Sequence, residues 1–344
     1  MADFKAKFRD WFFGRRADGA ISVGGQAVME GVMMQSPKKV AVAVRQSSGK
    51  IVYTVRDNKR LSEKYPILGY PLIRGCVSFV MSLVTGMKTL TESADMAGLD
   101  AEEPSKFEKK VAEILRVKPE DVVMGLAVFL AIAMSIGLFF ALPTGIEALL
   151  KKFVSSKFLL NLLGGIVRIC VFLLYIWLCS RLKEIRRVFQ YHGAEHKSIF
   201  CFESGEELTV ENARKFTTQH PRCGTSFLVI VMVISILIFI LLGSDSANVF
   251  QRLGSRLLLL PLVAGISYEV LKGLAYAEES KIVRLMKAPG LMVQKITTQP
   301  PDDAMLEVAL VALRASLGMD IPETSAYSGK DEPPAIERIA GKKA

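Results

Sequence analysis

Long apolar stretches constrain the fold of this chain more than any other feature of its sequence. A helix rises about 1.5 Å per residue, so it needs roughly 20 apolar residues to cross the hydrocarbon layer of a membrane. Stretches that meet this requirement lie at about residues 122–142, 158–180, 226–242 and 256–274. The first and third contain no charged residue. We therefore expect a mainly α membrane protein with four transmembrane helices between residues 122 and 274.

A fifth apolar stretch, residues 65–90, contains Arg74, Lys88 and several glycines. We expect it to form an interfacial or re-entrant helix. Charge is sparse in the four expected spans, where Arg168 lies in the second and Glu269 in the fourth. An unpaired charge there costs about 3 kcal/mol, so Arg168 is a candidate partner for Glu269. An ion pair without any catalytic role explains both residues equally well.

The composition agrees with a membrane location. Hydrophobic residues make up 51% of the 344 residues, and the mean hydropathy is +0.32. Lys and Arg give a net charge of +10 and are concentrated before the first expected span and in the loop at residues 181–225. The positive-inside rule then places this loop and both termini in the cytoplasm. Topology and contact with anionic lipid explain the charge, and no nucleic-acid-binding motif is visible.

The pattern changes outside the expected spans. We expect an amphipathic helix at residues 1–20, a small cytoplasmic β domain at 21–64, interfacial and cytoplasmic helices at 65–121, cytoplasmic helices at 275–320 and a disordered tail at 321–344. The N-terminal segment mixes Phe and Trp with basic residues, as helices on membrane surfaces do, although an ordinary packed helix fits equally well. Two β-branched runs, at 40–45 and 50–55, flank Gly49 and predict a β-hairpin.

All three histidines of the chain lie in the loop at residues 181–225. We expect the helix of the second span to continue into this loop. His192 and His196 would then share one helical face, with Glu195 beside them. In zinc hydrolases two imidazoles hold the metal and a carboxylate takes a proton from water, and His-x-x-Glu-His is the inverzincin order. The pattern predicts a zinc site with Glu195 as general base.

Three ligand sets compete for the other coordination positions. The first is His192, His196 and His220, with water in the fourth position. The second adds Cys223, which closes the site and makes it structural; histidine and cysteine both suit zinc. The third uses Glu269, because inverzincin-type peptidases take a distant downstream glutamate as a ligand. We favour the first set, with Cys223 and Glu269 nearby.

Several segments of the chain carry a family resemblance. They are Gly24–Met34, His192–Lys197, His220–Ser226, Gly265–Glu269 and Pro289–Thr298. Together they resemble the YqhQ-like family of bacterial multi-pass membrane proteins, which are regarded as predicted metal-dependent enzymes of unknown function. The resemblance covers nearly the whole chain apart from the tail. It implies a location in the bacterial cytoplasmic membrane and supplies no substrate.

Two functions from different classes fit these observations. The first is a membrane-embedded zinc-dependent hydrolase, such as a peptidase, acting at the cytoplasmic membrane face on membrane proteins or lipid-linked molecules. Glu195 would be its base, and Arg222 or Lys197 would stabilise the developing oxyanion. The second is a non-enzymatic membrane scaffold, assembly factor or insertion factor with a structural metal or polar cluster. In that case Cys223 is a ligand and no coordination position is open.

Overall fold

The computed structural model describes residues 23–59, 64–99, 110, 113–114, 119–242, 249–277, 280–324 and 335–340. The amphipathic helix expected at residues 1–20 lies outside the described residues. The chain divides into two compact units. One comprises residues 1–99, 176–234 and 259–344, and the other comprises residues 100–175 and 235–258.

The first unit contains a five-stranded sheet in the order β1-β2-β3-β4-β5. Its strands are β1 (Gly24–Val28), β2 (Gly31–Gln35), β3 (Lys39–Arg45), β4 (Ile51–Asp57) and β5 (Ile336–Arg338). The first four form an antiparallel meander, and β5 joins β4 in parallel. The predicted hairpin is confirmed as β3 and β4, and Gly49 in its turn has a φ of 88°. Strand β5 lies within residues 321–344, so part of the tail that we expected to be disordered is ordered on the sheet.

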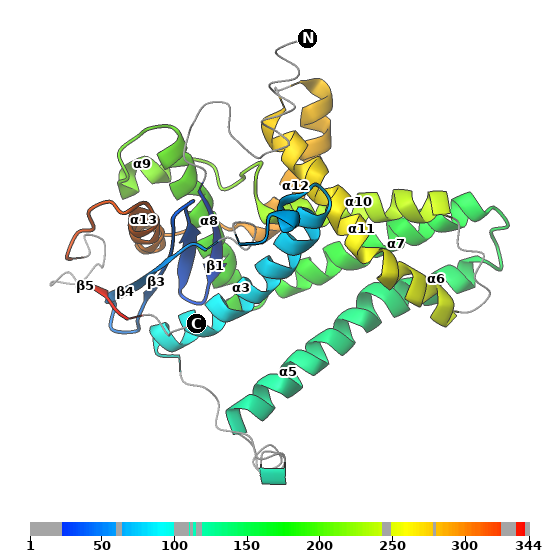
Figure 1. Ribbon diagram of the computed structural model, residues 1–344, viewed down its shortest axis with the longest axis horizontal. Coiled ribbons are helices and arrows are strands. Elements are labelled where there is room, and N and C mark those ends of the chain that lie inside the picture. The colour runs from blue at the N-terminus through cyan, green and yellow to red at the C-terminus, as the bar shows by residue number, and fades with distance from the viewer. Residues whose placement is uncertain are drawn as a thin grey trace. The chain divides into compact units, whose positions relative to one another are not determined.

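Helices cover both faces of this sheet (Figure 1). On one face lie α8 (Lys183–Glu203) and α13 (Asp303–Leu317), which share a hydrophobic core with β2 and β3. On the other face lies the end of α3 (Ile73–Ala97), where Met96 and Ala97 pack among valines of the sheet. Because both faces are covered, β3 is buried along nearly its whole length and shows no alternation of apolar and polar residues. The sheet, α8 and α13 therefore form one folded body.

Among the described residues, five helices are long and apolar enough to cross a membrane, and they indicate association with a lipid bilayer. They are α3, α5 (Pro119–Ile136) with its continuation through the π-helical turn η2 (Gly137–Ala141) into α6 (Leu142–Leu150), α7 (Lys157–Cys179), α10 (Gly224–Leu242) and α11 (Val249–Tyr276). Each of the four expected spans corresponds to one of these helices. The fifth is α3, which we expected to be interfacial or re-entrant and which has the lowest mean hydropathy of the five. The remaining described helices are η1 (Pro66–Gly69), α9 (Val210–Arg214) and α12 (Lys281–Thr297).

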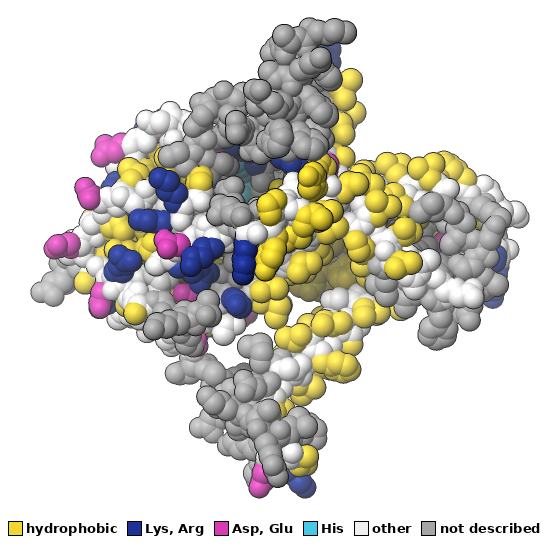
Figure 2. Space-filling view, in the orientation of Figure 1, with side chains coloured by type: hydrophobic (Ala, Val, Ile, Leu, Met, Phe, Trp, Pro, Cys, Tyr) yellow, Lys and Arg dark blue, Asp and Glu magenta, His cyan; other side chains and the backbone are white. Residues whose placement is uncertain are grey.

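Helix α3 has an apolar part and a part that is bound to the sheet. Its first part exposes large apolar side chains, including those of Val80, Leu83 and Met87. Figure 2 shows hydrophobic side chains gathered along this part of the unit and Lys and Arg side chains over the neighbouring sheet. Near its end, Ser93 Oγ accepts a hydrogen bond of 3.1 Å from the backbone N–H of Met29. Polar contacts thus fix the end of α3 to the sheet.

The charged residues of the apolar helices have partners that the sequence did not indicate. Glu269 on α11 forms an ion pair with Arg74 at the start of α3, in which Arg74 Nε donates to Glu269 Oε1 at 2.7 Å. Arg168 on α7 instead lies 3.6 Å from Glu147 on α6. The expected pairing of Arg168 with Glu269 is therefore wrong. Arg74 lies in residues 65–90, which we did not expect to cross the membrane, and Glu147 lies just after the first expected span. Neither residue was therefore considered as a partner.

Replacing Arg74 with methionine is expected to destabilise the protein by about 3–5 kcal/mol, because it leaves the Glu269 carboxylate, whose side chain is only 11% exposed, without its arginine partner. Unfolding in detergent, followed by circular dichroism, measures the effect. The double substitution Arg74→Met with Glu269→Leu removes both charges and should recover most of the loss. A single variant as stable as the wild type would show that the ion pair has no structural role.

Candidate metal centre

The two histidines of the His-x-x-Glu-His segment lie on α8, which is a helix of its own. Helix α7 ends at Cys179, α8 begins at Lys183, and Leu182 between them is extended, with φ −71° and ψ 133°. The expectation of one continuous helix is therefore wrong. The prediction that His192 and His196 share a helical face is confirmed, because their ring centroids are 4.4 Å apart.

Backbone carbonyls fix the orientation of both imidazoles. Nδ1 of His192 lies 2.9 Å from the carbonyl oxygen of Thr297, at the end of α12. Nδ1 of His196 bonds in the same way to the carbonyl oxygen of Thr218. A carbonyl oxygen only accepts hydrogen bonds, so each Nδ1 carries the proton and each Nε2 keeps a lone pair. Metal-binding histidines are oriented in this manner, with the second nitrogen held by a carbonyl or carboxylate.

The thiol of Cys223 lies where these two lone pairs converge. Its Sγ is 3.2 Å from Nε2 of His192, and one donor atom from each of His192, His196 and Cys223 lies within 4.8 Å of the others. His196 is 1% exposed, and its buried Nε2 makes no hydrogen bond of normal geometry. Burial lowers the pKa of His196, although the nearby Cys223 raises it in part. The three side chains thus present two nitrogens and one sulfur to a common point.

His220 has other partners at both ring nitrogens. Its Nδ1 accepts a hydrogen bond of 3.3 Å from the backbone N–H of Arg222, and its Nε2 lies 3.4 Å from Oε2 of Glu203. Glu203 also forms an ion pair with the Arg222 side chain. These charged and hydrogen-bonding neighbours hold the pKa of Glu203 below its usual value against the effect of burial. Although the ring of His220 lies 5.6 Å from that of His196, its nitrogens are already engaged.

The two cations that we predicted to stabilise an oxyanion are also engaged. Arg222 pairs with Glu203, as described above. The ammonium group of Lys197 donates to the backbone carbonyls of Arg214 and Phe216. In this arrangement both side chains hold the segment between α8 and α10, which carries Cys223.

Glu195 is buried beside the cluster, with 5% of its surface exposed. Burial raises the pKa of its carboxyl group to about 7, while the neighbouring His192 and a hydrogen bond from the backbone N–H of Gly25 both act to lower it. A Cβ at Gly25 would lie 2.9 Å from Cδ of Glu195. Gly25 therefore allows β1 to approach this carboxyl group closely, which explains the second glycine of the Gly24–Met34 segment.

Gly193, between the two histidines, is required by close packing. A Cβ at this position would lie 2.2 Å from the carbonyl oxygen of Gln299. The backbone N–H of Gln299 in turn donates to the carbonyl of Phe189 on α8, at 2.9 Å. Gly193 thus lets the chain after α12 lie against α8.

Gly193→Ala is expected to destabilise the protein by about 1–3 kcal/mol, because the new methyl group forces α8 and the Gln299 backbone apart. The midpoint of thermal unfolding in detergent measures this. Gly125→Ala is a matched control on α5, since nothing lies within 4 Å of its Cβ position. An equal response of both variants would contradict the proposed contact.

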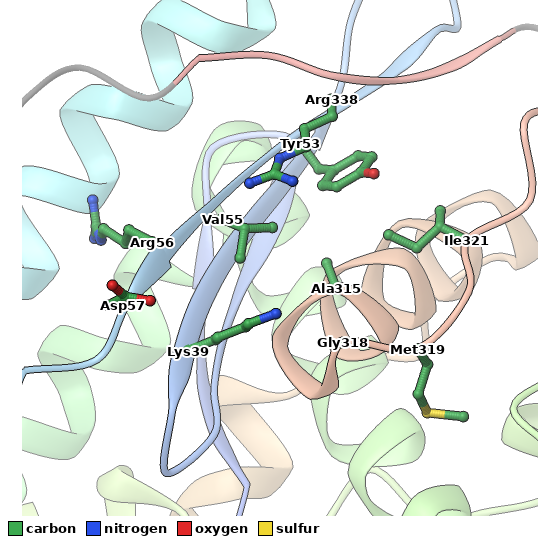
Figure 3. Close-up of a pocket in the computed structure, with 10 residues that line it drawn as sticks. All are labelled: Lys39, Tyr53, Val55, Arg56, Asp57, Ala315, Gly318, Met319, Ile321 and Arg338. Atoms are coloured by element: carbon green, nitrogen blue, oxygen red, sulfur yellow. The ribbon is translucent and has the colours of Figure 1, made fainter.

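Other predicted and observed features lie away from the cluster. Glu269 pairs with Arg74 and does not belong to the group of converging donors. A cavity of about 520 Å³ lies between β4 and the end of α13, where Lys39, Tyr53 and Arg338 contribute to its lining (Figure 3). It contains none of the residues predicted for the site. The converging donors His192, His196 and Cys223 are therefore the candidate centre.

Sequence reasoning missed the residues that hold this centre in place. Glu203 binds His220 and Arg222, and the side chain of Gln294 binds both backbone groups of His220. The carbonyls of Thr218 and Thr297 carry no signal in the sequence, because every residue has one. Gln294 and Thr297 do lie in the Pro289–Thr298 segment that carries the family resemblance.

These features define the class of the protein. It is a helical protein with helices of membrane-spanning length, a small sheet near the N-terminus and a His-His-Cys cluster beside the start of an apolar helix. The chain belongs to the family described as "Protein of unknown function (DUF1385)", whose model matches residues 70–319. This range runs from the start of α3 to the end of α13 and includes the whole cluster.

A curated relative supports the same assignment. The chain is 30% identical over 305 residues to "Uncharacterized protein YqhQ" of Bacillus subtilis (strain 168), and the match covers 86% of this chain and 92% of that protein. The predicted resemblance to the YqhQ-like family is thereby confirmed. No solved structure matches the chain.

Proposed function

We propose that this protein is a zinc-dependent hydrolase of the bacterial cytoplasmic membrane, with His192, His196 and Cys223 as its metal ligands. One observation carries the proposal: two imidazoles fixed through Nδ1 turn their Nε2 atoms toward one thiol. The buried Nε2 of His196 makes no hydrogen bond of normal geometry and has the Cys223 thiol beside it, so a cation between the two would satisfy its lone pair. Two nitrogens and one sulfur suit zinc better than magnesium or calcium.

The chemistry follows from the number of donors and from Glu195. Three protein ligands with a further position for water or substrate are typical of catalytic zinc sites. A zinc ion bound here would supply Lewis acidity and lower the pKa of water in the site to near 7. Glu195, adjacent to His196 and buried, would take up a proton at its carboxylate and pass it to the leaving group.

The number of candidate spans between the sheet and α8 supports a location of the site at the cytoplasmic face. The sheet packs against α8 in one core, so both lie on the same side of a membrane. Three of the five candidate spans, namely α3, the α5–α6 stretch and α7, lie between the sheet and α8 in the chain. Three crossings would place the two on opposite sides, so at least one of these helices does not cross.

Helix α3 is the best candidate for the helix that does not cross. It is the least apolar of the five, and its end is bound to the sheet through Ser93 and Met96. Four crossings then remain, and the sheet, α8 and α13 lie on one side. The basic residues of the loop at 181–225 favour the cytoplasmic side. Cys223 directly precedes α10, so the site would lie at the membrane surface and accept membrane proteins or lipid-linked molecules.

Metal content is the test of the site. Mass spectrometry of the detergent-purified protein, never exposed to a chelator, should find about one zinc per chain, and His196→Ala should lose it. Hydrolysis is then sought by comparing new protein N-termini in membrane vesicles that contain the zinc-loaded or the chelator-treated protein. Absence of any metal from both wild type and variant would refute the proposal.

A second candidate function is favoured by the presence of Cys223 and by the burial of the cluster. A scaffold or assembly factor would use a closed metal site to connect α8, the loop that contains His220 and the end of α12. Cobalt substitution distinguishes the two functions. The absorption spectrum of the cobalt form should change when acetohydroxamate is added if a coordination position is open, and should stay the same if the site is closed.

A further inference from the structure

Helix α12 exposes a stripe of large apolar side chains. Ile282, Leu285, Met286 and Met292 are 72%, 74%, 48% and 64% exposed. Their spacing places them on one side of the helix. Lys281, Arg284 and Lys295 are also exposed and lie on the adjoining side. Soluble helices bury such a stripe, whereas helices that lie in a membrane surface combine it with basic residues.

Two points along α12 lie near the ends of candidate membrane spans. Its first residue, Lys281, follows within a few residues of the candidate span that ends at Ala275. In its middle, Gly290 packs against Ser226 in the first turn of α10, where a Cβ would lie 2.6 Å from Ser226 Oγ. If α10 and α11 cross the membrane, a helix that lies near the ends of both would run along the membrane boundary.

We propose that α12 lies in the anionic lipid surface with its apolar stripe among the acyl chains, and that from this position it holds the metal centre in shape. The occupant of the stripe is thus lipid, since the basic residues beside it complement anionic headgroups. The second part of the proposal rests on the proposed metal site; the first does not.

The C-terminal end of α12 contacts both the loop that carries Cys223 and the side chain of His192. Gln294 is fully buried, and its Oε1 accepts from the N–H of His220 at 2.7 Å while its Nε2 donates to the carbonyl of His220 at 2.8 Å. Its Nε2 also donates to Ser226 Oγ at 3.2 Å. One turn further on, the carbonyl of Thr297 holds His192. Gln294 is therefore a positioning residue for the loop that carries Cys223, and α12 connects this loop to α8.

Tryptophan fluorescence tests the position of the stripe. The chain has two tryptophans, Trp11 and Trp177, which are first replaced with phenylalanine. A single tryptophan is then introduced by Leu285→Trp, in nanodiscs that contain brominated phosphatidylglycerol and phosphatidylcholine. Leu228→Trp on α10 is the standard for lipid, and Ser47→Trp in the turn of the sheet is the standard for water.

The proposal expects the tryptophan at position 285 to be quenched by brominated lipid as strongly as the one at 228, and to resist aqueous iodide. Quenching by iodide as strong as at position 47 would place the stripe in water and overturn the proposal. Protection from both quenchers would show that protein, such as a second copy, covers the stripe, and would overturn it equally.

Zinc affinity tests the connection to the metal centre. Gln294→Ala should weaken zinc binding about 10–100-fold in a competition with a chromogenic chelator, as is typical for residues that orient ligands. The double variant Ile282→Gln with Leu285→Gln touches no residue of the centre and should weaken zinc binding in the same direction, whereas Met319→Gln, at an exposed apolar residue after α13, should not. Unchanged affinity in the stripe variant would refute the connection. A wild type without zinc would refute it together with the proposed function, while the fluorescence result would still decide where α12 lies.

Discussion

Cys223→Ala is expected to release zinc from the purified protein, and His220→Gln is expected to leave it bound. The sulfur of Cys223 lies 3.2 Å from Nε2 of His192, whereas both ring nitrogens of His220 already have partners in Arg222 and Glu203. Loss of a ligand should weaken binding by more than the roughly 10–100-fold that is typical of outer partners. Zinc content per chain after gel filtration measures the difference.

The experiment needs controls for thiol content and for folding. Cys170→Ala removes an exposed cysteine of α7 and should keep zinc at the wild-type level. Circular dichroism shows whether each variant still folds. If His220→Gln loses zinc and Cys223→Ala keeps it, the three-histidine set that the sequence favoured is correct. If both variants lose zinc and remain folded, the site has four protein ligands and the scaffold function gains support.

The elements of this fold that depend on local pattern could be predicted from the sequence. The apolar stretches predicted the long helices, and the β-branched runs predicted the hairpin of β3 and β4. One of the helices expected at residues 275–320 is α13, which Asp302 caps by accepting a hydrogen bond from the N–H of Met305 at 2.8 Å. Spacing alone placed His192 and His196 on one face of a helix. All of these signals arise within about 20 residues of chain.

The arrangement of segments that are distant in sequence could not be predicted in this way. Glu269 is paired with Arg74, which precedes it by most of the chain, and no local pattern distinguishes Arg74 from Arg168. The sequence also left open whether His220 or Cys223 faces the two histidines of α8. His220 and Cys223 are three residues apart, and contacts of the His220 ring with Glu203 and with the backbone of Arg222 leave Cys223 as the residue that faces His192 and His196.

The number of crossings shows how long-range packing constrains topology. Hydropathy is evaluated for each helix separately, and five of the described helices are apolar enough to cross a membrane. Contact between the sheet and α8 adds the condition that an even number of crossings separates them, which hydropathy cannot express. In the proposed topology residues 65–90 do not cross the membrane, although α3 is long and apolar enough to do so.

Glu195→Gln is expected to retain zinc and to lose hydrolytic activity by about 10²–10⁴-fold, because the amide cannot take up a proton. The substitution preserves the shape of the side chain, and the amide oxygen can still accept the hydrogen bond from Gly25. Burial already disfavours the charged form of Glu195, so a neutral amide should not cost stability. Zinc content and the count of new N-termini in membrane vesicles are measured on the same preparation.

The two measurements together separate the functions proposed for this protein. Retained zinc with lost cleavage assigns Glu195 as the base of a hydrolase. Retained zinc with unchanged cleavage would remove Glu195 from the chemistry, and cleavage that also survives His196→Ala would come from another protein in the vesicles. If the wild type holds zinc but generates no new termini, the buried cluster serves to connect α8, the loop with Cys223 and α12, as a scaffold requires.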